Sequence, residues 1–161
     1  MWRRRREAPL DTIDRKILRA LLEDGRQTNA RLAERVGLSP SATLERVRRL
    51  ERNGSIRGYR AVIDPEAVGY GVQALVGIRL RTHVATGIQP FERAVQEVDG
   101  IVSCYHVTGP FDYVLHVVAR DLADLRDLNN NQIAALPSMG RLESLLVLSE
   151  IKTGPVWPLQ E

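Results

Sequence analysis

The sequence predicts an α+β fold with a helical N-terminal region followed by an antiparallel sheet and its helices. Apolar residues recur at helical spacing up to about residue 54, whereas from Val72 they alternate with other residues in several separate stretches. Charge divides at nearly the same place. Through Arg60 the chain has 16 Lys or Arg and 8 Asp or Glu, whereas residues 61–161 have 7 Lys or Arg and 12 Asp or Glu. A basic helical part therefore precedes an acidic mixed part.

The basic part is predicted to contain three helices. The first opens at Asp11, a good N-cap, and Gly25 is its natural stop. The second begins near Thr28 or Asn29 and ends at Gly37. Short helices joined by glycine-containing turns are expected to pack around one small core.

The third helix follows the tight turn at Gly37. Ser39 caps it, Pro40 takes its first position, where a missing N–H costs nothing, and Gly54 ends it. Helix, tight turn and basic helix together are typical of a helix-turn-helix, which places the N-terminus of its second helix in the major groove of DNA. We therefore predict that the protein binds double-stranded DNA.

The candidate DNA contacts lie on and just after this third helix. They are Ser39, Ser41, Glu45, Arg46, Arg48, Arg49, Arg52 and Arg57. Ser41, Glu45 and Arg46 are expected at base edges, because Arg can bond guanine in a fork and Glu can accept from cytosine. The other arginines are expected to contact phosphates, which position the protein without specifying sequence. Ion pairing along the helix is the alternative for any single arginine.

The acidic part is predicted to contain four strands and two helices. Before these elements, Ile56 to Ile63 is expected to form a short strand or wing. A linker through Pro65 follows, and then a segment at Glu66–Gly71 that has two glycines and resembles a hinge. The later strands are expected at 72–80, 101–107, 113–119 and 142–151, and the helices at 90–98 and from Asp121 to Pro137. Leu122, Leu125 and Leu128 recur along the second of these helices. The order βαββαβ is that of a ferredoxin-like domain. Its helices cover one face of the sheet, and a second copy is the simplest cover for the other.

Composition restricts where the protein works. No apolar run approaches the roughly 18 residues that a membrane span needs. The opening residues, MWRRRREAPL, lack an apolar stretch and a cleavage site, so they are not a secretory signal. Cys104 is the only cysteine and cannot form an internal disulfide, which fits a reducing compartment. We expect a cytoplasmic, nucleoid-associated protein.

Three segments resemble the Lrp/AsnC, or feast/famine, family of transcriptional regulators. They are LDTIDRKILRALLEDGR, VGLSP…LERVRRLERNGSIRGY and TGPFDYVLHV, and the resemblance extends from Leu10 to about Thr153. It implies a winged helix-turn-helix, a linker strand and a ferredoxin-like domain of the RAM type that dimerises. Dimers in the family often assemble into tetramers or octamers, and many members bind a free amino acid where dimers meet.

By this resemblance the effector site borders the TGPFDY turn. The candidate residues are His106, Thr108, Gly109, Asp112, Ala134, Ser144, Leu145 and Leu146. Asp112 is the candidate partner of the effector's ammonium group, and backbone groups near Thr108 and Gly109 are candidates for its carboxylate. The turn departs from many family members at Pro110, which has no N–H to donate.

The predicted domains follow from these observations. They are a basic arm at 1–9, a helix-turn-helix domain at 10–59, a linker strand and hinge at 60–71, an effector-binding and dimerisation domain at 72–154, and a tail at 155–161. The Arg3–Arg6 run within the arm is either a DNA-contacting arm or a disordered tail.

Two other functions were weighed against an effector-responsive regulator. An architectural nucleoid protein would coat DNA with little sequence preference and no ligand. An enzyme is disfavoured, although proteins similar to this family act as sirohaem decarboxylases, because that chemistry needs a basic cavity and the second half of this chain is acidic. We find no nucleophile–base pair or phosphate loop, and three scattered histidines predict no metal site. No cofactor is predicted.

Overall fold

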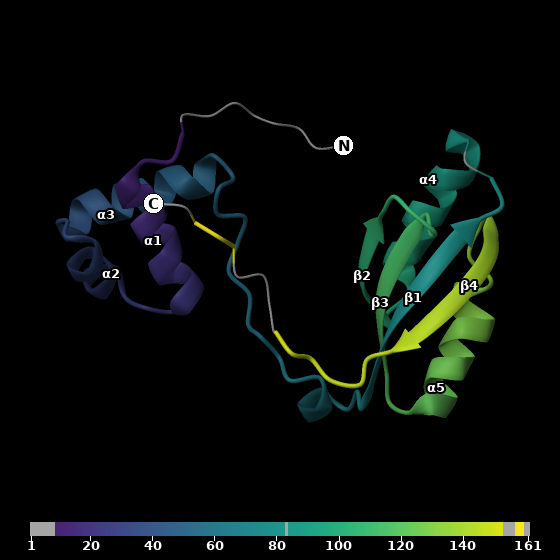
Figure 1. Ribbon diagram of the computed structural model, residues 1–161. Coiled ribbons are helices and arrows are strands. Elements are labelled where there is room, and N and C mark those ends of the chain that lie inside the picture. Colours follow the sequence, from purple (N-terminus) through teal and green to yellow (C-terminus); the bar gives the residue numbers. More distant parts are fainter. Residues whose placement is uncertain (1–8, 83, 153–156, 160–161) are drawn as a thin grey trace. The chain divides into compact units, whose positions relative to one another are not determined.

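A computed structural model describes residues 9–82, 84–152 and 157–159. They form two compact units, one that runs up to Ala61 and includes residues 157–159, and one that spans Val62–Lys152. Figure 1 shows the helices and strands of both units. The predicted Arg3–Arg6 arm lies outside the described residues, as does part of the predicted tail.

Three helices make up the first unit. They are α1 (Thr12–Glu23), α2 (Asn29–Val36) and α3 (Pro40–Arg52). The predicted caps Asp11 and Ser39 are confirmed, because each side chain accepts a backbone N–H of the first turn, and Thr28 caps α2 in the same way. The first and third helices end two residues before Gly25 and Gly54, at Glu23 and Arg52.

A small apolar core holds these helices together. Its fully buried members are Ile17, Ala20, Leu32, Val36 and Leu50. Half-buried residues such as Leu38 in the turn and Ile56 after α3 pack against it. All three helices contribute at least one residue, so the position of α3 depends on both of the others.

The strand predicted at Ile56–Ile63 is wrong. Among the described residues, 57–64 have no strand partner and form no helix. Val62 and Ile63 are exposed, Val62 to 96%. Alternation of apolar residues favours an extended chain, but a strand also needs a neighbour to pair with, and none of the described segments supplies one. A 3₁₀ turn, η1 (Glu66–Val68), follows.

Four strands form one antiparallel sheet in the second unit. They are β1 (Val72–Leu80), β2 (Ile101–His106), β3 (Tyr113–Ala119) and β4 (Met139–Leu146). Their order is β2-β3-β1-β4, so β1 lies between β3 and β4. A helix follows β1 and another follows β3. The predicted α+β fold with a ferredoxin-like βαββαβ domain is confirmed.

Helix α4 (Ala85–Ala94) continues as a 3₁₀ turn, η2 (Val95–Glu97). Its predicted start at Pro90 is wrong, because the helix begins at Ala85 and Pro90 lies inside it. The ring of a helical proline disturbs the carbonyl four residues earlier, which here belongs to the first turn. The disturbance therefore stays near the helix start, and Phe91 and Val95 are buried as predicted.

Helix α5 (Leu122–Asp127) runs into a π-helical stretch, η3 (Leu128–Ile133). Asp121 caps it as predicted, accepting the N–H of Asp124 at 2.8 Å. Leu125 and Leu128 are buried, whereas Leu122 is exposed. Leu122 is the first residue of α5, which in Figure 1 begins beyond the ends of the strands.

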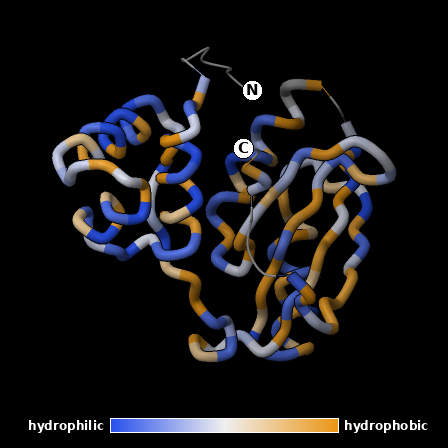
Figure 2. The backbone as a smooth tube through the Cα atoms, turned by 60° about the vertical axis from the view of Figure 1, so that its left-hand side comes forward, coloured by the Kyte–Doolittle hydropathy of each residue, from blue (hydrophilic) through white to orange (hydrophobic). Residues whose placement is uncertain are grey.

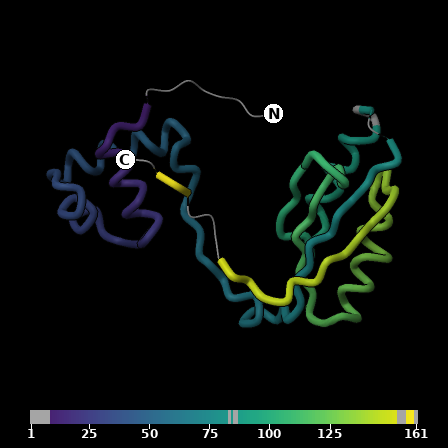
Figure 3. Tube along the Cα trace, in the orientation of Figure 1, coloured from purple at the N-terminus to yellow at the C-terminus, as the bar shows by residue number. Residues whose placement is uncertain are grey.

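The last strand is shorter than the predicted 142–151 at its end and longer at its start. It begins at Met139 and ends at Leu146. The N–H of Val147 still bonds the carbonyl of Gln73 at 2.9 Å, after which the trace leaves the sheet (Figure 3). Because β1 begins at Val72, β4 has no partner beyond this point.

The two faces of the sheet have different surroundings. Ala74, Val76, Ile78 and Leu80 of β1 are buried with α4 and α5 in one apolar core. The alternate residues of β1 lie on the opposite, open face, where Leu75 stands opposite Leu145 of β4 and both are exposed. Figure 2 shows hydrophobic stretches along the strands, and Figure 1 shows both helices on the same side of the sheet.

Phe111 lies against the open face at Gly77. A Cβ atom added to Gly77 would come within 2.6 Å of the Phe111 ring. We expect Gly77→Ala to lower the free energy of unfolding by about 1–3 kcal/mol, because the ring must move away. Urea denaturation followed by circular dichroism measures this. Gly25→Ala is the control, since its Cβ would meet atoms only at 3.6 Å and beyond. Equal midpoints for the two variants would contradict the expectation.

Candidate functional site

The connection between α2 and α3 has the geometry of a helix-turn-helix. Gly37 ends α2 with φ 73°, and its N–H bonds the carbonyls of the last turn. The Ser39 hydroxyl then accepts the N–H of Ala42 at 3.2 Å and lies 3.1 Å from the Ser41 hydroxyl. Residues 39–42 are exposed. The N-terminal end of α3 is therefore accessible, with its positive dipole end toward solvent.

Most of the predicted DNA contacts are exposed on this helix or just after it. Arg48 and Arg57 make no hydrogen bond or ion pair with any described residue. Glu45 bonds Arg52 at 3.1 Å, although both side chains remain more than half exposed. Such an exposed pair is weak and can rearrange when a phosphate approaches.

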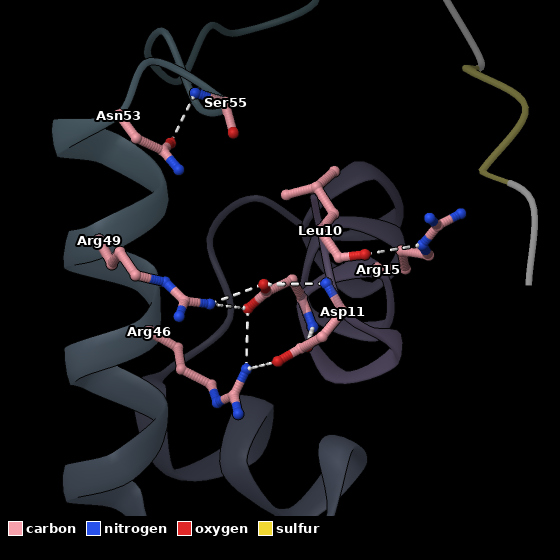
Figure 4. A network of polar contacts seen from close by, with 8 residues as sticks. Leu10, Asp11, Arg15, Arg46, Arg49, Asn53 and Ser55 are labelled. Atoms are coloured by element: carbon pink, nitrogen blue, oxygen red, sulfur yellow. Dashed lines mark hydrogen bonds and ion pairs between the residues drawn. The ribbon is translucent and has the colours of Figure 1, made fainter. Parts of the chain in front are cut away.

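Arg46 is placed differently from the expectation that it lies on the exposed face. Its Nη1 bonds an oxygen of Asp11 at 2.6 Å and one of Asp14 at 3.0 Å, so the side chain is turned toward α1 (Figure 4). Arg49 bonds both oxygens of Asp14, at 2.5 and 2.6 Å. The predicted phosphate contact at Arg49 therefore also has an internal partner. The Asp14 side chain is 4% exposed, so its negative charge needs these two guanidinium groups.

The two aspartates also cap α1. The N–H of Asp14 bonds Asp11 at 2.7 Å, and the N–H of Asp11 bonds Asp14 at 3.2 Å. The Arg46 guanidinium, together with the N–H of Asp14, lowers the pKa of the Asp11 carboxyl, and Asp11 in turn raises the pKa of Arg46. The stabilisation is present above the ordinary pKa of 3.8 and is lost as the pH falls through the lowered value.

Sequence reasoning missed this network. Asp14 lies in the first turn of α1, where a negative charge is favourable by itself. Its arginine partners, however, are 32 and 35 residues away. No local pattern predicts that pairing.

We expect Asp14→Asn to destabilise the first unit by about 2–3 kcal/mol, because two partly covered guanidinium groups lose their charged partner. Asparagine keeps the shape and much of the capping. The matched control is Glu45→Gln, which breaks an exposed pair and should cost less than about 1 kcal/mol. Urea denaturation compares the two. A loss for Asp14→Asn no larger than that for Glu45→Gln would show that the network contributes little.

The TGPFDY turn is fixed to the centre of the sheet. The N–H of Asp112 bonds the carbonyl of Ile78 at 2.8 Å, and the Asp112 carboxylate accepts the N–H of Leu80 at 2.8 Å. The N–H of Val107 bonds the carbonyl of Asp112 at 2.9 Å and closes the turn. Asp112 therefore stabilises the turn, whatever else it binds.

The structure does not bring the predicted effector residues together within one chain. Ser144, Leu145 and Leu146 pair with Val76, Leu75 and Ala74 of β1. These partners lie two to four residues from Ile78, where the turn is attached, or roughly 7–13 Å along the strand. The strand β1 separates the turn from β4.

The remaining predicted residues also lie in different places. Ser144 bonds Asn129 of η3 at 3.0 Å, on the helix-covered side, whereas Leu145 lies on the open face. The His106 ring stacks on the Tyr113 ring, with 4.6 Å between the ring centroids. Ala134 follows η3 and is exposed. Thr108 and Gly109 are exposed in the turn.

The described residues offer no metal centre. No group of three or more His, Cys, Asp or Glu converges among them. His116 bonds Gln73 at 2.9 Å on the open face, whereas His106 stands opposite the buried Tyr113, so the two histidines occupy different faces. No helix within the described ranges is long and apolar enough to cross a membrane.

A helix-turn-helix unit joined to an antiparallel α+β unit defines a DNA-binding protein with a separate ligand-binding domain. Residues 10–57 match the family described as winged helix-turn-helix DNA-binding, and residues 73–157 match the Lrp/AsnC ligand binding domain. The chain therefore belongs to the Lrp/AsnC family of transcriptional regulators, which are not enzymes.

Relatives and solved structures agree with this assignment. The chain is 40% identical to the leucine-responsive regulatory protein of Escherichia coli, over 89% of this chain and 87% of that protein. A transcriptional regulator from Neisseria meningitidis, solved as a complex with L-methionine, is 35% identical with a TM-score of 0.89, covering 94% and 97% of the two chains. A feast or famine regulatory protein from M. tuberculosis, also complexed with L-methionine, is 36% identical with a TM-score of 0.86, covering 94% and 100%.

Proposed function

We propose that the protein regulates transcription as a homo-oligomer whose assembly responds to a free amino acid. The observation that carries this proposal is the separation of the turn from Ser144–Leu146 within one chain. A pocket that uses both sets of residues needs a second chain. Binding of an effector in such a pocket depends on assembly, and by linkage the effector also changes assembly.

The open face of the sheet is the proposed contact between two copies. It presents Leu75 and Leu145 side by side, 41% and 61% exposed, and Tyr105 beside Val114. No described helix of the same unit covers these side chains. Exposed apolar patches of this kind mark association surfaces. Dimers formed here would assemble further into tetramers or octamers.

On DNA, the N-terminal end of α3 is proposed to enter the major groove. Ser41 and Glu45 are the proposed base contacts, next to the Ser39 cap. Arg48 and Arg57 are the proposed phosphate contacts that need no rearrangement. Arg49 and Arg52 are also proposed to contact phosphates, but each is already paired with a carboxylate of the same unit. Arg46 remains a proposed base contact, but it must leave Asp11 and Asp14 to reach guanine.

The proposed effector is an amino acid because its two charged groups fit the turn. The amide nitrogens of Thr108 and Gly109 bond no described group and are accessible to a carboxylate. The Asp112 carboxylate is the proposed partner of the ammonium group. The relatives solved with L-methionine support this ligand class. We also propose that the protein works in the cytoplasm, at the nucleoid.

Two substitutions separate phosphate contacts from base contacts. We expect Arg57→Ala to weaken binding to specific and scrambled duplexes equally and to reduce the salt slope by about 0.9. We expect Glu45→Ala to reduce the ratio of specific to scrambled affinity by roughly 5- to 100-fold. Mobility shifts on the protein's own upstream DNA at two salt concentrations measure both. A loss of preference in Arg57→Ala, or equal loss on both duplexes in Glu45→Ala, would reverse these roles.

The effector is tested with the twenty common L-amino acids. We expect one or a few to raise the melting temperature, because they bind only the folded protein, and to shift the sedimentation coefficient. Asp112→Asn keeps an acceptor for the N–H of Leu80 but loses the charge, so it should respond more weakly. If no amino acid changes either measurement, the effector proposal is wrong. Continuous rather than periodic protection in a DNA footprint would then favour the architectural alternative.

A further inference from the structure

Arg79 lies beside the effector turn. It is the next-to-last residue of β1, exposed on the open face of the sheet. Its Nε donates a hydrogen bond to the carbonyl of Pro110, in the middle of the turn. Arg79 is therefore held against the one residue of this turn that has no amide hydrogen.

Most of the donors of Arg79 are unused. A guanidinium group has five N–H donors in a planar fork, and only the Nε–H of Arg79 has a partner among the described residues. The facing arginine on β4, Arg141, differs because it pairs with Glu143 at 3.1 Å. The two terminal nitrogens of Arg79 are thus available for an anion.

The turn itself presents further donors. The amide nitrogens of Thr108, Gly109 and Phe111 donate to no group within the described part of the chain. The bonds from Asp112 to Ile78 and from Leu80 to Asp112 fix the turn to the strand that carries Arg79. The Phe111 ring lies against Gly77 on the same strand and helps to hold the turn in this position. The guanidinium and the free amides therefore occupy one rigid neighbourhood.

We propose that Arg79 binds the carboxylate of the amino-acid effector and supplies the donor that Pro110 lacks. This inference rests on the proposed function, because it names the residue that recognises one end of that effector. A guanidinium can bond both oxygens of a carboxylate with two parallel N–H donors. The turn amides complete the site, and the Nε–H bond to Pro110 sets the direction of the fork.

The test compares L-methionine with L-methioninamide, which keeps the side chain and ammonium group but lacks the carboxylate. If another amino acid is the better ligand, it and its amide replace this pair. We expect Arg79→Gln to weaken binding of the amino acid by roughly 10- to 100-fold in calorimetry and to leave the affinity for the amide within about 3-fold. Arg79→Lys keeps the charge without the fork and should lie between the wild type and Arg79→Gln.

Arg126→Gln, an exposed arginine on α5, is the matched control and should bind both probes as the wild type does. Unchanged binding of the amino acid by Arg79→Gln would overturn the inference while the proposed function stands. Equal losses of affinity for both probes would also overturn the inference, because Arg79 would then only support the turn. Altered sedimentation of Arg79→Gln without ligand would overturn it too, because Arg79 would then support the contact between copies. Failure of the wild type to bind any of the twenty amino acids would overturn both proposals.

Discussion

The pairing of β1 with two neighbours is the constraint on which the ligand-binding unit depends. Because β1 lies between β3 and β4, its alternate residues build both faces of the domain. Ala74, Val76 and Ile78 anchor the apolar core against α4 and α5. Ile78 and Leu80 also fix the TGPFDY turn, because the Ile78 carbonyl accepts the N–H of Asp112 and the Leu80 N–H donates to the Asp112 carboxylate. A shift of β1 by one residue would exchange the two faces and detach the turn.

The helical unit depends on a buried negative charge in the same way. Asp14 closes the capping box of α1 and holds Arg46 and Arg49 of α3. The direction of α3 is thereby tied to the start of α1 by charge as well as by the apolar core. The same arginines belong to the surface proposed to contact DNA, so internal pairing and binding of DNA compete for them. Arg48 and Arg57, which have no described partner, do not face this competition.

The open features of the chain share one explanation. Residues 57–64 have no strand partner among the described residues. The face with Leu75 and Leu145 is not covered by its own helices, and the predicted effector residues are divided between the turn and an edge strand. Each of these features is incomplete in a single chain. A second copy would satisfy all three, which is the physical basis for proposing that assembly and ligand binding are coupled.

The sequence by itself determined the elements that local chemistry specifies. Asp11, Ser39 and Gly37 marked helix ends because capping acts between neighbouring residues. The alternation from Val72 and from Tyr113 marked strands because one face of each is buried. Family membership followed from motifs that run through both units.

Only the tertiary structure decided what distant residues do to one another. It turned Arg46 toward aspartates 32 and 35 residues earlier. It also left Ile56–Ile63 without a strand partner in the described part of the chain, and it ended β4 where its neighbour β1 has no further residues. It also placed Arg79 against Pro110, 31 residues later. Pairing in space carries no periodic signal along the chain, because the energy of a contact depends on distance between atoms and not on separation in sequence.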